Sequence, residues 1–240
     1  MLKLVGFDAD DTLWHSEGYY REVHGHFEQI LGHYIDIGND KVHEHLLEVE
    51  RRNIKLFGYG AKGMTLSMLE TAVAMTAERI SARHLHEILQ LGKDVLTHPV
   101  RLLEGVAEAV AEVAREYQVV LITKGDLFHQ ESKVARSGLS PLFGRIEIVS
   151  EKDPPTYLRV LSEFGLAPHQ FLMVGNSLHS DIAPVLQIGA FAVHVPYPLT
   201  WALDHHEGCI ADDDKLRTVE STAQVPAAVR ELALNAARRH

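Results

Sequence analysis

Three carboxylates lie close together near the start of the chain, at Asp8, Asp10 and Asp11. They come directly after the short apolar segment 2–7, whose composition is typical of a strand buried on both faces. Three negative charges at the end of a buried strand repel one another, so folding alone gives little reason for them. A divalent cation would neutralise the cluster, and hard oxygen ligands suit Mg²⁺. The alternative interpretation is an Asp-rich turn, because Asp also favours turns.

Further polar side chains follow three later segments that are rich in β-branched and aliphatic residues. They are Thr123 at the end of the predicted strand 118–123, Lys152 after 146–149, and Asn176 and Asp181 after 171–174. In open α/β sheets, ligands bind outside the carboxyl ends of the strands. We therefore expect these side chains to lie near the aspartates. Taken singly, each also has an ordinary explanation as a strand end or an exposed loop residue.

From residue 98 onwards, short predicted strands alternate with predicted helices, one of them at 182–188, which indicates a parallel, doubly wound sheet. Between the first strand and this region the strand pattern disappears. Four helices are predicted there, at 15–34, 40–57, 64–76 and 81–96, the last with Ser81 as a candidate N-cap. We expect an α/β fold with a Rossmann-like core formed by residues 1–14 and 97–240, and a four-helix bundle inserted at residues 15–96.

A glycine-rich loop within the predicted insert reads Gly58-Tyr59-Gly60-Ala61-Lys62-Gly63. It lacks the full phosphate-binding loop pattern, and no strand leads into it. One interpretation is a connector between two helices. The other is a loop that faces the substrate, with Lys62 meeting an anionic group, because glycines permit close backbone approach to a ligand.

The composition is that of a globular protein in which acidic residues outnumber basic ones, giving a formal net charge of -10. We find no stripe of Lys and Arg, which argues against nucleic acid as a partner, because phosphate backbones bind clustered positive charge. No apolar segment approaches the roughly 20 residues that a membrane-spanning helix needs. The chain starts without a signal-peptide pattern and contains one cysteine, so we expect a cytoplasmic protein without an intrachain disulfide. The oligomeric state is left open.

Four motifs occur in a fixed order along the chain. They are Asp8-x-Asp10-x-Thr12-Leu13, Thr123-Lys124-Gly125, Lys152, and the segment 175–181 with Asn176 and Asp181. With these motifs in this order, the chain resembles the haloacid dehalogenase (HAD) superfamily of phosphohydrolases. The resemblance covers essentially the whole chain. It implies a HAD-like core with a helical cap domain inserted after the first motif.

The resemblance also implies catalytic roles for four residues. Asp8 would be the nucleophile that forms an aspartyl-phosphate, and Asp10 the general acid and base. Thr123 would hydrogen-bond a phosphoryl oxygen. Lys152 would offset the charge of Asp8 and of the phosphoryl group. Lys152 is assigned as the only lysine in its loop, although one proline there is shifted relative to the usual Lys-Pro pattern.

The metal site implied by the resemblance would hold Mg²⁺ with Asp8, the backbone carbonyl of Asp10, Asn176 and Asp181. Relatives usually carry Gly-Asp where this chain has Gly175-Asn176. An Asn carbonyl can still bind Mg²⁺, but it brings no charge. The difference from the family pattern therefore bears on how tightly the metal binds and not on whether it binds.

The second motif departs from the family pattern as well. It reads Thr123-Lys124-Gly125, where relatives often have Thr-Asn-Gly, and the change adds a cation near the expected phosphoryl pocket. We expect Thr123, Lys124 and Gly125 to contact the substrate, together with Lys62 from the insert.

The leading hypothesis is a magnesium-dependent phosphatase acting on a small phosphorylated metabolite. A dehalogenase on the same fold would attack carbon and would not need an acid at position 10, so Asp10 argues against it. A phosphosugar mutase would share the core residues, and the sequence excludes it poorly. A non-catalytic protein that binds a phosphorylated metabolite is the third alternative, and Asn176 keeps it open.

Overall fold

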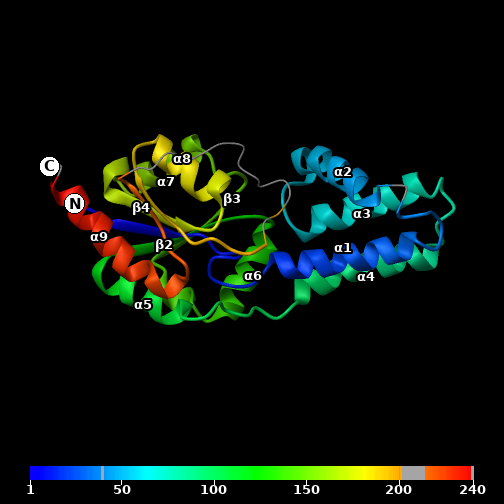
Figure 1. Ribbon diagram of the computed structural model, residues 1–240, viewed down its shortest axis with the longest axis horizontal. Coiled ribbons are helices and arrows are strands. Elements are labelled where there is room, and N and C mark those ends of the chain that lie inside the picture. The colour runs from blue at the N-terminus through cyan, green and yellow to red at the C-terminus, as the bar shows by residue number, and fades with distance from the viewer. Residues whose placement is uncertain (39–40, 200, 202–213, 239–240) are drawn as a thin grey trace. The chain divides into compact units, whose positions relative to one another are not determined.

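The computed structural model describes residues 1–38, 41–199, 201 and 214–238 of the 240-residue chain (Figure 1). The chain divides into two compact units. One contains Met1–His15, Val100–Lys124 and Gln130–His240, and the other contains Ser16–Pro99 with Gly125–His129. We call them the sheet unit and the helical unit.

The described part of the sheet unit has six parallel strands in the order β3-β2-β1-β4-β5-β6. Their bounds are Leu4–Phe7 for β1, Gln118–Lys124 for β2, Arg145–Val149 for β3, Phe171–Gly175 for β4, Phe191–His194 for β5 and Leu216–Thr218 for β6. The register sets Leu4 of β1 opposite Gln118 of β2 and Phe171 of β4. Every residue of β1 is buried, as expected for a central parallel strand made of apolar residues.

The strand order reverses at β1. The chain passes outward through β2 and β3 on one side, then returns to add β4, β5 and β6 on the other side. At such a reversal, neighbouring connections leave the sheet in opposite directions, and ligands bind beyond the carboxyl ends of the strands at that point. The loops after β1 and β4 therefore occupy the favoured ligand position of this sheet.

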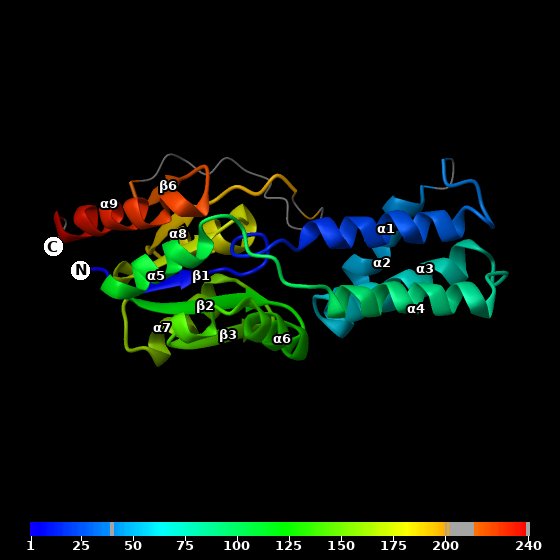
Figure 2. The same ribbon diagram turned by 90° about the horizontal axis from the view of Figure 1, so that it is seen from below.

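Helices cover both faces of the sheet. One apolar cluster packs α5 (Val106–Glu116) and α9 (Val225–Arg238) on one face, and a second packs α7 (Pro154–Glu163) and α8 (Ala183–Gln187) on the other. Figure 1 shows the two pairs on opposite sides of the strands, and Figure 2 shows α5 and α9 side by side. The prediction of a doubly wound parallel α/β sheet is confirmed.

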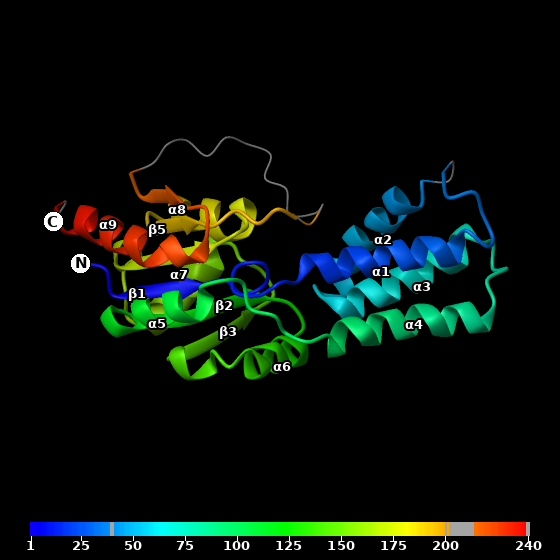
Figure 3. The same ribbon diagram turned by 60° about the horizontal axis from the view of Figure 1, so that its bottom comes forward.

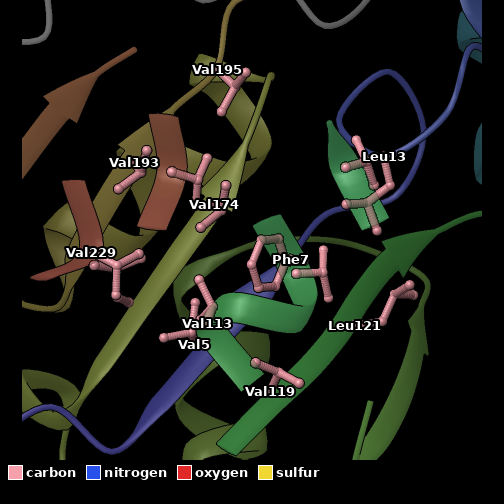
Figure 4. Close-up of a cluster of buried hydrophobic side chains, with 14 of the residues drawn as sticks. Val5, Phe7, Leu13, Val113, Val119, Leu121, Val174, Val193, Val195 and Val229 are labelled. Carbon is pink, nitrogen blue, oxygen red and sulfur yellow. The ribbon is translucent and has the colours of Figure 1, made fainter. Parts of the chain in front are cut away.

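The central strand is fixed by the first of these clusters (Figure 4). Phe7 of β1 lies among apolar side chains that include Val113 of α5, Leu121 of β2 and Val174 of β4, all of them buried. Burying one such side chain stabilises the fold by roughly 1.5–3 kcal/mol. The cluster thereby holds the end of β1, from which the aspartate-rich segment begins.

The segment after β4 differs from the prediction of a helix at 182–188. A π-helical turn, η3, spans Leu178–Ile182 and leads into the short helix α8. The Ser177 side chain accepts a hydrogen bond from the Ser180 N–H at 2.9 Å, so helical structure begins soon after the strand. The early turn places Asp181 beside β4 instead of at the head of a later helix.

The segments that lead into and out of the helical unit are joined by backbone hydrogen bonds. The Leu103 N–H donates to the Leu13 carbonyl at 3.0 Å, and the His15 N–H donates to the Arg101 carbonyl at 3.0 Å. Trp14 and Leu102 form an antiparallel bridge between these two bonds. The chain therefore leaves and re-enters the sheet unit at one paired anchor.

The described part of the helical unit is built from the helices α1 to α4, which can be followed in Figure 3. They are α1 (Glu17–Leu31), α2 (Val42–Phe57), α3 (Ala61–Met75) and α4 (Ala82–Thr97). Each contributes a fully buried side chain to one apolar core, namely Phe27, Leu46, Met68 and Ile88. The predicted cap Ser81 accepts a hydrogen bond from the His84 N–H at 3.2 Å. No helix in the described residues is both long and apolar enough to span a bilayer.

The glycine-rich loop is shorter than predicted, because α3 begins at Ala61. Gly58 and Gly60 have φ values of 74° and 112°, a backbone region that L side chains rarely adopt. These two glycines make the turn between α2 and α3. Lys62 therefore lies in the first turn of a helix and not in a flexible loop.

Candidate active site

The carboxylate of Asp8 lies directly beyond β1 and is held from two sides. Lys152 Nζ donates a hydrogen bond to Asp8 Oδ1, and Thr12 Oγ1 lies 3.0 Å from Asp8 Oδ2. The Asp8 N–H donates to the Val174 carbonyl at 2.9 Å, which extends the β1–β4 ladder by one residue. Asp8 is only 6% exposed. It is a buried acidic group with a fixed position.

Lys152 is shared between two buried carboxylates. Its Nζ also donates to Asp181 Oδ1 at 2.7 Å, while Asp181 Oδ2 accepts from the Ser177 N–H at 3.0 Å. Burial and the charge of Asp181 raise the pKa of Asp8 to about 7, although Lys152 acts in the opposite direction. Burial disfavours the charge on Lys152, but Asp181 and Asp8 hold the pKa of Lys152 above its ordinary value. When both carboxylates are ionised, this group of three therefore carries an excess negative charge.

Asp181 reaches Lys152 because Gly175 leaves room for it. A Cβ atom at Gly175 would lie 2.3 Å from Asp181 Cγ, far inside van der Waals contact. The η3 turn brings the carboxylate back over the last residue of β4. A side chain at position 175 would displace Asp181 and, with it, one of the two anions that hold Lys152.

Asp10, two residues after Asp8, has a separate set of partners. Lys133 Nζ lies 2.6 Å from each carboxylate oxygen, Trp14 Nε1 donates to Oδ1 at 2.7 Å, and Gln130 Nε2 donates to Oδ2 at 2.9 Å. Burial acts in the opposite direction, but Lys133, Gln130 and Trp14 hold the pKa of Asp10 below its ordinary value. The Asp10 side chain is still 29% exposed. It is an ionised carboxylate with a fixed orientation and an open side.

The end of β2 is tied to Asp10 through Gln130. Besides its bond to Asp10, Gln130 Nε2 lies 2.8 Å from Thr123 Oγ1 and 2.6 Å from the Lys124 carbonyl. Both Thr123 and Gln130 are almost completely buried. The side chains predicted at the ends of β1 and β2 therefore lie close together, as the strand order requires.

Lys124 connects the end of β2 with the loops after β3 and β4. Its Nζ donates to Ser180 Oγ at 2.8 Å and lies 3.4 Å from a carboxylate oxygen of Glu151. Gly125 follows with a φ of 137°, a conformation that L side chains rarely adopt. The cation that departs from the family pattern is thus part of the same edge of the sheet.

Asn176 lies beside Asp8 through a shared partner, Thr12. Thr12 Oγ1 accepts a hydrogen bond from the Asn176 N–H at 3.0 Å and lies 3.2 Å from Asn176 Oδ1. Because a hydroxyl has one proton, it donates either to this amide oxygen or to Asp8. His194 Nε2 lies 3.1 Å from the Asn176 carbonyl, and burial lowers the pKa of His194 below its ordinary value, which favours a neutral ring that donates this bond.

A family model for haloacid dehalogenase-like hydrolases matches residues 2–189 of this chain. The chain belongs to this family of hydrolases. The resemblance predicted from the order of the four motifs is therefore confirmed.

Individual relatives of this HAD-like hydrolase have different activities in their names. A haloacid dehalogenase-like hydrolase from Xanthomonas campestris is 54% identical, with a TM-score of 0.90 over 100% of this chain and 95% of that one. A glyceraldehyde 3-phosphate phosphatase from Pyrococcus furiosus is 24% identical over 204 residues, which are 82% of this chain and 81% of the relative. An L-2-haloacid dehalogenase from Xanthobacter autotrophicus is 17% identical, with a TM-score of 0.64 over 96% of this chain and 99% of that one, and shows the shared fold.

The donor atoms in this hydrolase fit a hard divalent cation. Asp8 and Asp181 offer carboxylate oxygens, Asn176 offers an amide oxygen, and the backbone carbonyl of Asp10 offers a second neutral oxygen. Within the described residues, no three His, Cys, Asp or Glu side chains converge as metal ligands. The candidate set is therefore a mixed one, with two carboxylates supplemented by amide and backbone oxygens. Burial and the charge of Asp181 raise the pKa of Asp8, and a cation bound there would compensate the negative charge.

Lys62 belongs to the helical unit of the hydrolase. Its Nζ forms an ion pair with Asp126 Oδ2 at 2.9 Å and lies 6.0 Å from the centre of the Phe128 ring. Asp126 directly follows the second motif in sequence, yet it is grouped with the helical unit. Lys62 therefore has an anionic partner already, and its contact with a substrate stays a prediction.

Sequence reasoning did not single out three residues that the structure places on Asp10. Gln130 and Lys133 are polar residues three positions apart on α6 (Leu127–Ser137), a spacing equally typical of a solvated helix face. Trp14 follows Asp10 by four residues and resembles an ordinary core aromatic. The available signal was position alone, since α6 directly follows the second motif.

Proposed function

We propose that this hydrolase is a phosphatase that requires a divalent cation, with Mg²⁺ as the expected ion, and that it acts on a small phosphorylated metabolite. The observation that carries the proposal is the contrast between two neighbouring carboxylates. Asp8 shares one lysine with Asp181, whereas among the described residues Lys133 forms its ion pair with Asp10 alone. A nucleophile beside a cation site and a separate acid-base group are what phosphoryl transfer to a carboxylate requires.

In the first step, an oxygen of the Asp8 carboxylate attacks phosphorus and forms an aspartyl-phosphate. The bond between phosphorus and the leaving oxygen breaks, and Asp10, which must carry a proton at this stage, donates it to the departing alkoxide. Lys152, hydrogen-bonded to Asp8, offsets the negative charge that gathers on the phosphoryl group. The Thr123 hydroxyl at the end of β2 donates a hydrogen bond to a phosphoryl oxygen.

In the second step, a water molecule attacks phosphorus and the bond to Asp8 breaks. Asp10 accepts a proton from this water, which restores the free Asp8 carboxylate and releases inorganic phosphate. Lys133 lowers the pKa of Asp10, which favours the ionised state that Asp10 reaches once it has donated its proton in the first step. The same residue thus acts as acid and then as base.

Four residues would hold the cation: Asp8, Asp10 through its backbone carbonyl, Asn176 and Asp181. When bound, the cation would neutralise charge on the phosphoryl oxygens during transfer. Asn176 contributes an oxygen without a charge, so we expect weaker metal binding than in a relative with Asp at this position.

The substrate class is supported by the cations around the site and by the phosphatase relative. Lys124 and Gly125 follow Thr123 at the end of β2 and would contact the phosphoryl group, while Lys62 would contribute from the helical unit. For Lys62 to bind an anionic substrate, the substrate must compete with Asp126 for its ammonium group. The glyceraldehyde 3-phosphate phosphatase is a relative that acts on a small phosphate ester by its name.

Asp10 also favours a phosphatase over a dehalogenase. A halide leaving group needs no proton, so a dehalogenase gains nothing from a carboxylate held by three side chains at this position. A phosphosugar mutase would use the same core residues, and product analysis separates it from a hydrolase, because a mutase returns the phosphoryl group to a sugar.

The test is the release of inorganic phosphate from p-nitrophenyl phosphate and from glycerol phosphate, with Mg²⁺ and with EDTA. We expect release only with the cation, and none from Asp8→Asn. The matched control is Asp94→Asn, which removes an exposed carboxylate on α4 and should leave turnover unchanged. Absence of phosphate release from a broad panel of phosphate esters would exclude the phosphatase. Tight binding of such esters without turnover would instead identify a non-catalytic binding protein.

A further inference from the structure

One face of α6 meets the carboxylate of Asp10. Gln130 and Lys133 are three residues apart, so they project from the same side of the helix. Lys133 Nζ lies 2.6 Å from both carboxylate oxygens of Asp10, and Gln130 Nε2 lies 2.9 Å from Oδ2. Both side chains are more than nine-tenths buried. The contacts of Lys133 and Gln130 with Asp10 therefore belong to the packed interior and are not those of an exposed surface pair.

The contacts fix the carboxylate without covering it. The equal distances from Lys133 place its ammonium group symmetrically between the two oxygens, and Trp14 Nε1 holds Oδ1 at 2.7 Å from another element. Charge-assisted hydrogen bonds of this kind are short and strong. The Asp10 side chain nevertheless keeps 29% of its surface exposed. A carboxylate that is immobilised and yet accessible is suited to a proton transfer that depends on orientation.

Gln130 additionally ties this carboxylate to the second motif. Its Nε2 also lies 2.8 Å from Thr123 Oγ1 and 2.6 Å from the Lys124 carbonyl. One amide group therefore fixes the position of Asp10 relative to Thr123, the residue proposed to hold the phosphoryl oxygen. A change at Gln130 would disturb both relations, whereas a change at Lys133 would disturb Asp10 alone.

We propose that Lys133 and Gln130 are positioning residues that aim the Asp10 carboxylate at the leaving-group oxygen of the substrate. This inference rests on the proposed phosphatase function. Lys133 acts through Asp10 alone and contributes nothing to turnover once Asp10 has lost its acid-base function, whereas Gln130 also acts through Thr123.

The test is a double-mutant cycle between Lys133 and Asp10. Lys133→Met removes the cation and keeps the length of the side chain. With glycerol phosphate, we expect kcat to fall by roughly 10- to 100-fold, as for a misplaced catalytic group, and KM to change by less than about threefold. With p-nitrophenyl phosphate, whose leaving group needs little protonation, the loss should be smaller. In the Asp10→Asn background, Lys133→Met should change kcat by less than about twofold.

Three comparisons make the cycle decisive. Arg136→Met removes an exposed cation from the next turn of α6 and should leave kcat unchanged. Lys133→Arg keeps the charge with a different geometry, and its loss should again be confined to proteins that contain Asp10, which tests the proposal even if Lys133→Met does not fold. Gln130→Met should lower kcat with both substrates, because it also releases Thr123.

The inference is overturned if Lys133→Met or Lys133→Arg lowers kcat by the same factor with and without Asp10, since that is the behaviour of a general structural role. The inference is overturned as well if Lys133→Met leaves kcat unchanged in the protein that contains Asp10. Failure of the proposed function is a different result, because the parent protein would then release no phosphate from either substrate.

Discussion

Asp8 and Asp10 are two residues apart, both follow the same strand, and each contacts a buried lysine, yet their surroundings act on them in opposite ways. Lys152 has to balance Asp8 and Asp181 together, and the pKa of Asp8 rises to about 7. Lys133 balances Asp10 with help from two further donors, and the pKa of Asp10 falls below its ordinary value. Burial raises the pKa of both carboxylates, but at Asp8 the charge of Asp181 adds to this effect, whereas at Asp10 the contacts with Lys133, Gln130 and Trp14 outweigh it.

The two environments suit the two roles that we propose for these carboxylates. A buried group of two anions and one cation is stabilised by a further cation, so the Asp8 side suits a metal and a phosphoryl group. A balanced pair has no such need, so the Asp10 side is free for proton transfer. Pairs of titratable groups whose environments drive their pKa values apart are a general sign of divided roles in catalysis.

The largest expected effect is that of Asp8→Asn. The amide has nearly the same shape but is a poor nucleophile, so turnover should fall by on the order of 10⁴-fold or more, as when other covalent nucleophiles are removed. The measurement is phosphate release at saturating Mg²⁺, with near-UV circular dichroism as a check on the fold. Turnover close to that of the parent protein would rule out the aspartyl-phosphate route.

Asp10→Asn should have a smaller effect that depends on the leaving group. A positioned acid-base group contributes roughly 10²- to 10⁴-fold, and we expect a loss of that size with alkyl phosphates. The loss should be less with aryl phosphates, since their leaving groups need less protonation. Rates are compared for a series of esters with leaving groups of different pKa. Equal losses across the series would remove the distinction between the two aspartates.

The same two substitutions should change stability in opposite directions in metal-free protein at about pH 8. Asp8→Asn removes a buried carboxylate whose ionisation is unfavourable, so we expect a gain of about 1 kcal/mol or more. Asp10→Asn leaves the buried Lys133 without its anion, and we expect a loss of about 2 kcal/mol, less than for a fully buried pair because Asp10 is partly exposed. In a chain of this size, each kcal/mol corresponds to a Tm change of about 2–4 °C. Shifts of the same sign would contradict the charge comparison.

The pH dependence of these shifts follows from the two pKa directions. Asp8 binds its proton more tightly in the folded state. Its contribution to stability is therefore lost as the pH rises from 3.8, the ordinary pKa of this carboxyl, to about 7, its pKa in the folded state. The advantage of Asp8→Asn should therefore vanish near pH 4. The pKa of Asp10 is lowered, so its contribution is present above the ordinary pKa of 3.8 and is lost as pH falls through the lower folded pKa. The deficit of Asp10→Asn should persist at pH 5 and shrink only in stronger acid.

Asn176→Asp should have the smallest effect, and it tests the surroundings of Asp8 alone. Asn176→Asp adds a negative charge close to Asp8 and should tighten Mg²⁺ binding by roughly tenfold, a net gain of about 1.4 kcal/mol. Phosphate binding should weaken in the same protein, since the added charge also repels the substrate. A magnesium titration of activity at saturating substrate gives both half-activation values. Unchanged or weaker half-activation after the substitution would mean that Asn176 does not act on the metal.

Most of the sheet unit was predictable, because its signals are local or follow from topology. Apolar runs of four to seven residues gave the strands, and the meeting of parallel strand ends at one edge brought Asp8, Thr123, Lys152 and Asp181 together. The ends of the elements were less predictable. The first turn of α3 and the η3 turn both began earlier than expected, because backbone capping and glycine conformations decide those boundaries.

The partners of Asp10 were not predictable from the sequence. Lys133 and Gln130 lie more than one hundred residues from Asp10 in the chain, on a helix whose pattern alone also fits a solvated face. Only packing of α6 against the end of β1 turns these polar residues inward. The opposite pKa shifts of Asp8 and Asp10 likewise depend on distances between groups from different strands, and a motif does not encode them.

The paired anchor formed by Leu13, His15, Arg101 and Leu103 makes the four-helix insertion a removable module in the architectural sense. Backbone hydrogen bonds join the two ends of the insertion to each other at the sheet. A foreign segment joined at the same two points would therefore start and end at neighbouring positions and would not have to hold the strands together. Sequence change between these points is consequently decoupled from the register of β1 and β2. In a scaffold of this kind, the contiguous block between these points can change while the residues proposed to perform the chemistry are left in place.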